Sequence, residues 1–215
     1  IVGATGSGKT TIISLLLRFY DVNSGRITLD GKDIREYALQ DLRRCFALVL
    51  QESWLFEGSV YENIGYAAPS ERSTPEKIRE LCRQIEVDDF IQTLPGGYDS
   101  ILHNDSGGLS QGQKQLLNIA RAFLCDPPIF ILDEATSSVD TQTEAKIQQV
   151  TDKVIEGKTS IIIAHRLSTI LSADCILVMK DGEIRETGTH EELLKKGGLY
   201  KELYESQFLS GETEE

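Results

Sequence analysis

Residues Gly3–Thr10 read GATGSGKT and match the phosphate-binding pattern G-x-x-x-x-G-K-[ST] at every fixed position. The residues before it, Ile1-Val2, have the character of a buried strand end, and the segment after it, KTTIISLLLRF, has that of a helix. A strand, a loop and a helix in this order distinguish a phosphate loop from a plain turn entering a helix, which is the alternative. We therefore predict that the chain binds a nucleoside triphosphate.

The loop supplies its chemistry through both backbone and side chains. Its glycines let backbone N–H groups turn inward around phosphate oxygens, and the helix N-terminus adds a favourable dipole. Lys9 would bridge the terminal phosphates, and the Thr10 hydroxyl would bind Mg²⁺. The predicted nucleotide-binding residues of the loop are Gly3, Thr5, Gly6, Ser7, Gly8, Lys9 and Thr10.

Composition places the chain among ordinary globular domains and argues against one class of partner. Of its 215 residues, 40% are hydrophobic and 26% are charged, and no apolar run approaches the length of a membrane span. The net charge of −12 argues against general nucleic-acid binding, which depends on Lys and Arg contacts to phosphates. A phosphate-loop strand is usually preceded by further chain, so we expect an N-terminal portion to be absent.

The four cysteines do not favour a metal site. Cys45, Cys82, Cys125 and Cys175 form no C-x-x-C pair, and the 3 histidines are scattered, so a structural zinc site is not expected. Each cysteine stands among apolar residues, which predicts reduced thiols in the core.

Strands alternate with helices along most of the chain, which predicts a mainly parallel sheet covered by helices on both faces. The stretch in between is mostly helical, and it begins with a helix at Thr74-Pro75. We predict an α/β P-loop NTPase core at 1–56 and 127–215 with a helical subdomain at 57–126. The expected strands are Gly25–Asp30, Phe46–Leu50, Ile129–Leu132, Ser160–Ala164, Cys175–Met179 and Glu183–Thr187; further helices are expected at Asp88–Leu94, from Leu116, at Thr141–Ile155 and at Leu167–Leu171.

Two acids, Asp133 and Glu134, directly follow the buried strand IFIL. Parallel α/β sheets place their active sites at the carboxyl ends of strands, so these side chains should face the phosphate loop. Asp133 would hold Mg²⁺ and Glu134 would act as general base on the attacking water. The alternative is an acidic turn that caps the next helix.

With these motifs in order, ILDEATSSVD, LSQGQKQLLNIARAFL and IIIAHRLST resemble the nucleotide-binding domain of an ATP-binding cassette (ABC) transporter, from Gly3 to about Phe208. The resemblance implies an ATPase that uses ATP and Mg²⁺, with Lys9, Glu134 and His165 as catalytic residues. LSQGQ stands where the family has its signature LSGGQ. In the family the signature, here Ser110, Gln111, Gly112 and Gln113, completes the ATP site of an opposing, head-to-tail domain.

Four further positions carry over from the resemblance. Gln51 matches the glutamine that senses Mg²⁺ and the γ-phosphate, and its alternative is a polar cap at a strand end. His165 matches the switch histidine that contacts the γ-phosphate, although a lone histidine is usually only a satisfied polar residue. Asp140 matches the D-loop aspartate that couples the two sites, and Thr11 would add an α-phosphate contact.

The segment QESWLFEGSVYENI (51–64) resembles the exporter branch of the family in particular. It implies that transmembrane domains dock through coupling helices at Gln51–Phe56, where Trp54, Leu55 and Phe56 would line a groove. The alternative, that these three are core residues, is about as well supported because large apolar side chains serve both purposes. The resemblance also implies a place on the cytoplasmic face of a membrane, as part of a transporter that powers export.

Two departures qualify the resemblance. Gln111 replaces a signature glycine, and LHNDSGG lacks the Glu-containing run common in symmetric exporters. We therefore expect a second nucleotide-binding domain as partner, either a second copy or, as we favour, a different chain in an asymmetric heterodimer. The family's adenine-stacking aromatic residue lies upstream of the phosphate loop, so we predict weak ATP affinity and low activity for this chain alone.

Two other functions share this fold. DNA-maintenance ATPases split the motifs with long coiled coils or carry zinc modules and basic surfaces, whereas this chain has a short insert and an acidic charge. A regulatory module that binds but does not hydrolyse nucleotide is the other alternative, against which Glu134 and His165 argue.

Overall fold

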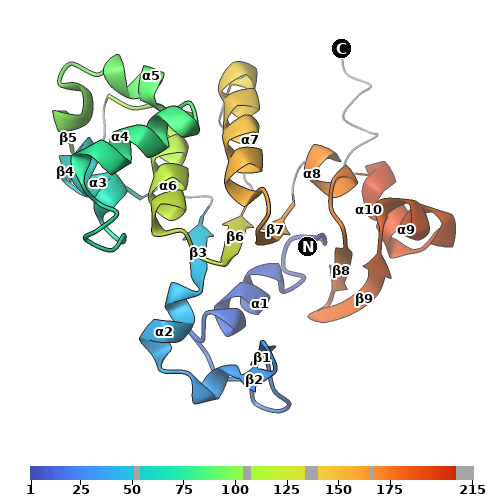
Figure 1. Ribbon diagram of the computed structural model, residues 1–215. Coiled ribbons are helices and arrows are strands. Elements are labelled where there is room, and N and C mark those ends of the chain that lie inside the picture. Colours follow the sequence, from blue (N-terminus) through green and yellow to red (C-terminus); the bar gives the residue numbers. More distant parts are fainter. Residues whose placement is uncertain (51–53, 104–107, 134–139, 165–166, 207–215) are drawn as a thin grey trace. The chain divides into compact units, whose positions relative to one another are not determined.

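The computed structural model describes residues 1–50, 54–103, 108–133, 140–164 and 167–206. The chain divides into two compact units, each considered by itself (Figure 1). Unit 1 comprises Ile1–Arg43 and Ile161–Glu215, and unit 2 comprises Arg44–Ser160. None of the helices in these described ranges is long and apolar enough to cross a membrane.

In unit 1 the first residues of the chain are held between two strands. Val2 forms a parallel bridge to Val178 of β8 (Ile176–Lys180), with its N–H bonded to Leu177 O at 2.9 Å. Ile1 O accepts from Ala164 N, just after β7 (Thr159–Ile163), at 3.1 Å. The chain start thus pairs in the way expected of a strand end, but as an isolated bridge at Val2 and not as a strand. A hydrophobic core lies around it, formed by Val2, Ile170, Ile176, Val178, Leu193 and Tyr200.

Two hairpins of unit 1 follow from their turn residues. Asp-Gly turns favour the left-handed backbone that joins twisted antiparallel strands. Asp30-Gly31, with φ of 50° and 80°, joins β1 (Thr28–Leu29) to β2 (Lys32–Asp33). Asp181-Gly182, with φ of 53° and 78°, joins β8 to β9 (Glu183–Gly188), close to the two strands expected at Cys175–Met179 and Glu183–Thr187.

The helices of unit 1 are short. The phosphate loop leads into α1, and α9 starts with a capping box in which Thr189 and Glu192 satisfy each other's backbone N–H groups. The helices are α1 (Lys9–Leu16), η1 (Ile34–Glu36), α2 (Leu39–Arg44, which ends in unit 2), α8 (Leu167–Leu171), α9 (His190–Lys196) and α10 (Leu199–Tyr204).

In unit 2, β3 (Phe46–Val49) and β6 (Ile129–Asp133) pair in parallel, with Phe46 opposite Ile129. Their apolar side chains are largely buried, as expected for a sheet with both faces covered. The helices here are α3 (Val60–Gly65), α4 (Pro75–Gln84), α5 (Asp88–Gln92), α6 (Gln111–Cys125) and α7 (Thr141–Ile155), together with the short elements β4 (Gly58–Ser59), η2 (Gly97–Asp99) and β5 (Ile101–Leu102).

Local signals located most of these elements. Thr74 caps α4 with Pro75 at its first position, and α7 has the bounds expected from the sequence. The predicted α/β class is confirmed, whereas the division at 57 and 126 stays a prediction. One expectation is wrong: Cys175, which precedes β8, is exposed, while Cys82 is buried and Cys45 and Cys125 are half-buried.

Candidate nucleotide-binding site

The phosphate loop of unit 1 has the backbone that anion binding requires. Gly6 and Gly8 take φ of 81° and 100°, which L-residues with a side chain rarely adopt. Gly8 caps α1 without any side-chain bond, so the first N–H groups of that helix stay directed toward the loop. The loop therefore provides a helix N-terminus whose dipole favours a phosphate.

The Lys9 ammonium currently bonds to the loop itself. Its Nζ donates to Gly3 O at 2.7 Å and to Ala4 O at 3.1 Å. These neutral carbonyls hold the side chain across the mouth of the loop. A phosphate oxygen is a stronger, charge-assisted acceptor for the same ammonium.

Close packing beneath the loop leaves no room for a side chain at position 3. A Cβ on Gly3 would lie 2.5 Å from Met179 O and 2.7 Å from Ser7 Oγ. The Ser7 side chain is buried, and its hydroxyl has no hydrogen-bond partner in the part of the chain that the structure describes. An unsatisfied buried hydroxyl is costly, and a bound phosphate would satisfy it. The residues thus fit a nucleotide phosphate. Thr5, Thr10 and Thr11 are exposed around this loop.

The signature residues lie in unit 2, at the start of α6. Ser110 Oγ accepts from Gln113 N at 3.2 Å and Gln113 Oε1 accepts from Ser110 N at 2.9 Å, a complete capping box. Gln111 is exposed and helical at the first position, whereas Gly112 is buried. Position 111 therefore needs no glycine for backbone reasons, and the extra side chain stands on the surface that the signature would present to a partner.

Two acids of the predicted site are described, both in unit 2. Asp133 ends β6 and is half-buried. Asp140 caps α7 by accepting from Thr143 N at 3.0 Å, and this bond holds the pKa of the Asp140 carboxyl below its usual value. Gln51, Glu134 and His165 lie outside the described residues, so their predicted roles stay predictions.

An exposed cluster of aromatic rings follows the Gln51 segment. Trp54, Phe56 and Tyr66, here called the aromatic surface, have ring centroids 5.0–6.4 Å apart. Trp54 is 60% exposed and Tyr66 is 66% exposed, while Leu55 is buried. Residues 54–56 were expected either to line a surface groove or to belong to the core. Leu55 belongs to the core, whereas Trp54 lies on the surface. A shallow groove beside the rings is lined by Phe56, Tyr61, Glu62, Gly65, Tyr66 and Ser73.

Behind this surface stands a pair of polar residues that no sequence motif indicated. Arg121 of α6 and Asn63 of α3 bond to each other and to the backbone of the aromatic surface. Arg121 follows the signature within LLNIARAF, but its partners are distant in sequence, so a single sequence carries no signal for them.

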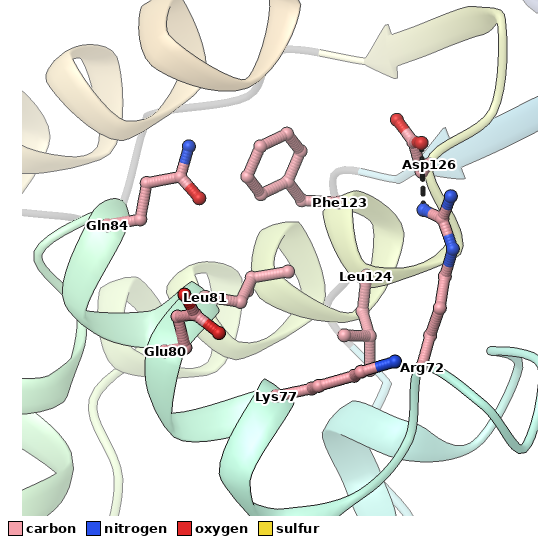
Figure 2. Close-up of a pocket in the computed structure, with 8 residues that line it drawn as sticks. All are labelled: Arg72, Lys77, Glu80, Leu81, Gln84, Phe123, Leu124 and Asp126. Atoms are coloured by element: carbon pink, nitrogen blue, oxygen red, sulfur yellow. Dashed lines mark ion pairs between the residues drawn. The ribbon is translucent and has the colours of Figure 1, made fainter.

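A second pocket of unit 2, of about 250 Å³, opens between α4 and α6 (Figure 2). Arg72 pairs with Asp126 at 2.8 Å on one side, and Leu81, Phe123 and Leu124 supply an apolar wall. None of the residues lining it belongs to the predicted nucleotide-binding motifs, and the charge pair at its rim ties the start of α4 to the end of α6.

Comparison with known proteins agrees with the motifs. The family model described as ABC transporter matches residues 1–137. The chain is 51% identical over 203 residues (94% of the chain) to the fatty acid ABC transporter ATP-binding/permease protein of Mycobacterium bovis, and 50% identical over 208 residues (97%) to the ATP-dependent lipid A-core flippase of Vibrio cholerae. It spans 32% and 36% of these two relatives, about a third of their length.

Solved structures include a similar fold. The structure of a bacterial Atm1-family ABC exporter with ATP bound matches 96% of this chain and 36% of that chain, with a TM-score of 0.84 and 40% sequence identity.

Proposed function

The chain belongs to the ABC transporter family, as one of its ATP-binding and ATP-hydrolysing domains, and we propose that it powers export across a membrane. The observation that carries the proposal is the phosphate loop, where the buried Ser7 hydroxyl has no hydrogen-bond partner among the described residues and the Lys9 ammonium donates to the neutral carbonyls of Gly3 and Ala4. Both groups gain a stronger partner when a phosphate enters.

In the proposed binding step, the backbone N–H groups of Gly6 and Gly8 and the start of α1 surround the phosphates. Lys9 exchanges the carbonyls of Gly3 and Ala4 for oxygens of the terminal phosphates, which are better acceptors because they are charged. Thr11 adds a contact to the α-phosphate.

In the proposed hydrolysis step, Glu134 takes a proton from the attacking water, whose oxygen forms a bond to the γ-phosphorus while the bond to the ADP oxygen breaks. His165 donates to the γ-phosphoryl oxygens. Thr10, Gln51 and Asp133 would hold Mg²⁺, which neutralises phosphate charge when bound. Lys9 stabilises the charge that develops on the leaving oxygens.

The second half of each site comes from another chain in this proposal. Ser110 and the N–H groups at the start of α6 face the γ-phosphate of the opposing domain in a head-to-tail pair, and Asp140 couples the two sites. The Ser110 hydroxyl can serve there because a hydroxyl that accepts from Gln113 N keeps its own proton to donate. ATP binding closes the pair and hydrolysis reopens it.

Glu134→Gln tests the hydrolytic role directly. The variant keeps the size of the side chain and removes the base, so we expect ATP hydrolysis to fall roughly 10²–10⁴-fold while ATP binding persists. Glu183→Gln, at an exposed position of β9, is the matched control. An unchanged hydrolysis rate for Glu134→Gln, measured at saturating ATP, would contradict the assignment.

We further propose that the partner is a different chain, because Gln111 places a bulky side chain on the surface that the signature presents. Size-exclusion chromatography of Glu134→Gln with ATP should then show incomplete homodimerisation, and the added change Gln111→Gly should increase the dimer fraction. A complete homodimer with both sites filled would contradict the asymmetry.

The aromatic surface is the proposed docking place of transmembrane domains through coupling helices, with the chain on the cytoplasmic face of the membrane. Exposed aromatic clusters commonly mark protein interfaces, and this one directly follows the segment that contains Gln51. Nucleotide-driven movement would reach the membrane part through it.

A further inference from the structure

Arg121 gathers three separate segments of unit 2 around one guanidinium group. It donates to Asn63 O on α3 at 2.7 Å, to Trp54 O at 3.0 Å and to Asn118 Oδ1 on α6 at 3.1 Å. Its guanidinium carbon also lies 5.9 Å from the centre of the Trp54 ring. One side chain of α6 thereby holds both the backbone and the ring of Trp54.

Asn63 completes the connection from the other side. Its amide is almost fully buried and accepts from Arg121 Nη2 and from Phe56 N, both at 3.0 Å. Its Nδ2 donates back to Phe56 O at 3.0 Å and to Ser59 O at 3.1 Å. The bonds of Asn63 lie in a half-buried place and the Arg121–Trp54 bond is exposed, and moving α6 without moving residues 54–59 would break several of them at once.

The same helix carries the signature residues at its other end. Ser110 caps α6, and Arg121 lies about 16 Å further along the helix axis. The helix between them is continuous and buried along one face, including Leu117 and Ala120, and such close packing resists local bending.

We propose that Arg121 and Asn63 are positioning residues that couple the signature end of α6 to the aromatic surface. Engagement of Ser110 by the ATP of an opposing chain shifts α6, and the Arg121–Asn63 connection passes this shift to Trp54 and Phe56. The connection works in both directions, because a coupling free energy between two sites is reciprocal. The inference rests on the proposed dimer and names the residues through which its closure reaches the docking surface.

An arginine suits this place better than a lysine. Its planar group presents five donors in a fixed arrangement, so it can bond to several carbonyls on different segments at once. A lysine ammonium at the same position would keep the charge but could not reach all of these partners together. Arg121→Lys therefore separates the charge from the geometry.

Trp54 is the only tryptophan of the chain and provides the readout. In the Glu134→Gln background, the Trp54 emission is recorded over a range of ATP and chain concentrations, and the fraction of dimer is measured in parallel by sedimentation. We expect the emission to change in proportion to the dimer fraction. With Arg121→Gln added, we expect the change per dimer formed to fall at least about three-fold, because the coupling is lost while Ser110 is intact. Arg121→Lys should give an intermediate loss.

Arg43→Gln is the matched control. Arg43 also donates to backbone carbonyls, of Leu17 at 3.1 Å and Arg18 at 3.3 Å, and lies over an aromatic ring, that of Phe19, but it belongs to unit 1. Its loss should leave the Trp54 response per dimer unchanged. The urea unfolding midpoint of each variant is also measured. A variant with a midpoint close to that of the parent keeps its structure, so a lower Trp54 response in it reports uncoupling and not unfolding.

Each result decides between the two proposals. A dimer that forms with no change in Trp54 emission, or an unchanged response per dimer in both Arg121 variants, would overturn the coupling and leave the proposed function standing. If Arg121→Gln does not fold, an undiminished response in Arg121→Lys overturns the coupling by itself. The absence of any ATP-dependent dimer, both in the parent and with Gln111→Gly added, would contradict the proposed head-to-tail pair, and the coupling with it.

Discussion

The phosphate loop and the Arg121–Asn63 connection are built in opposite ways. In the loop, Lys9 bonds to carbonyls 5 and 6 residues away, so the motif and its structure occupy the same short stretch of chain. Arg121 bonds to carbonyls 58 and 67 residues away, on segments that share no motif with it. Local sequence is therefore enough to recognise the chemistry, whereas the route that would transmit it depends on tertiary structure.

Within this comparison, the largest expected effect concerns the loop. Lys9→Ala removes the ammonium that would bind the terminal phosphates, and losing one such electrostatic contact typically lowers turnover about 10²–10³-fold. Steady-state ATP hydrolysis measures it, with Lys32→Ala as the control at an exposed position of the same unit. If Lys9→Ala kept most of the activity, the proposed role of the phosphate loop in ATP hydrolysis would be contradicted.

The next largest effect should be the loss of folding stability when a side chain is added to the tightly packed glycine of the loop. A Cβ on Gly3 would stand 2.5 Å from Met179 O, whereas a Cβ on Gly6 would meet no atom within 4 Å. Gly3→Ala should thus destabilise the fold by about 1–3 kcal/mol through overpacking. Gly6→Ala should cost only about 1 kcal/mol through its left-handed backbone. Urea unfolding measures the free energy of unfolding of both variants. Equal losses of stability in the two variants would show that Gly3 is not tightly packed against Met179.

Ion pairs between distant segments should make the stability of unit 2 depend on pH in the acidic range. Glu86 binds Lys146 and Lys153 of α7, and these two ammonium groups lower the pKa of the Glu86 carboxyl from 4.5 to about 2. A lowered folded pKa stabilises the fold above the unfolded pKa, and this stability is lost as the pH falls from about 4.5 toward 2.

Glu86→Gln should therefore flatten the dependence of the unfolding midpoint on pH in that window, whereas Glu80→Gln, at an exposed position of α4, should not. The effect should be small because Glu86 is solvent-exposed. Parallel curves for the parent and Glu86→Gln would contradict the role of Glu86.

The smallest expected effect is a difference in alkylation rate between a thiol of unit 1 and a thiol of unit 2. Burial raises the pKa of the Cys82 thiol to about 12, and Cys175 is exposed. Iodoacetamide should therefore modify Cys175 long before Cys82, because the thiolate is the reactive form and must be accessible. Peptide mass spectrometry after brief labelling measures the order, and early labelling of Cys82 would mean that unit 2 opens readily.

The sequence was enough to predict those elements whose structure is determined by residues close together in the chain. The Thr74-Pro75 helix start, the bounds of α7 and the phosphate loop all follow from the chemistry of residues close together in the chain. It placed Cys175 wrongly in the core, because an apolar neighbourhood in sequence does not fix which side of a strand faces water. It missed Asn63 as a tertiary partner, since nothing near Asn63 in the chain indicates Arg121.

The central claim is that each ATP site takes its phosphate loop from one chain and the start of α6 from another. The direct test mixes Lys9→Ala chains with Ser110→Ala chains, both carrying Gln111→Gly so that like chains pair, at a concentration where dimers form, and measures ATP hydrolysis. Mixed pairs contain one intact site, so the rate should exceed that of either variant alone and approach about a quarter of the rate of Gln111→Gly alone for random pairing. A mixture no more active than the two variants measured separately would contradict the account.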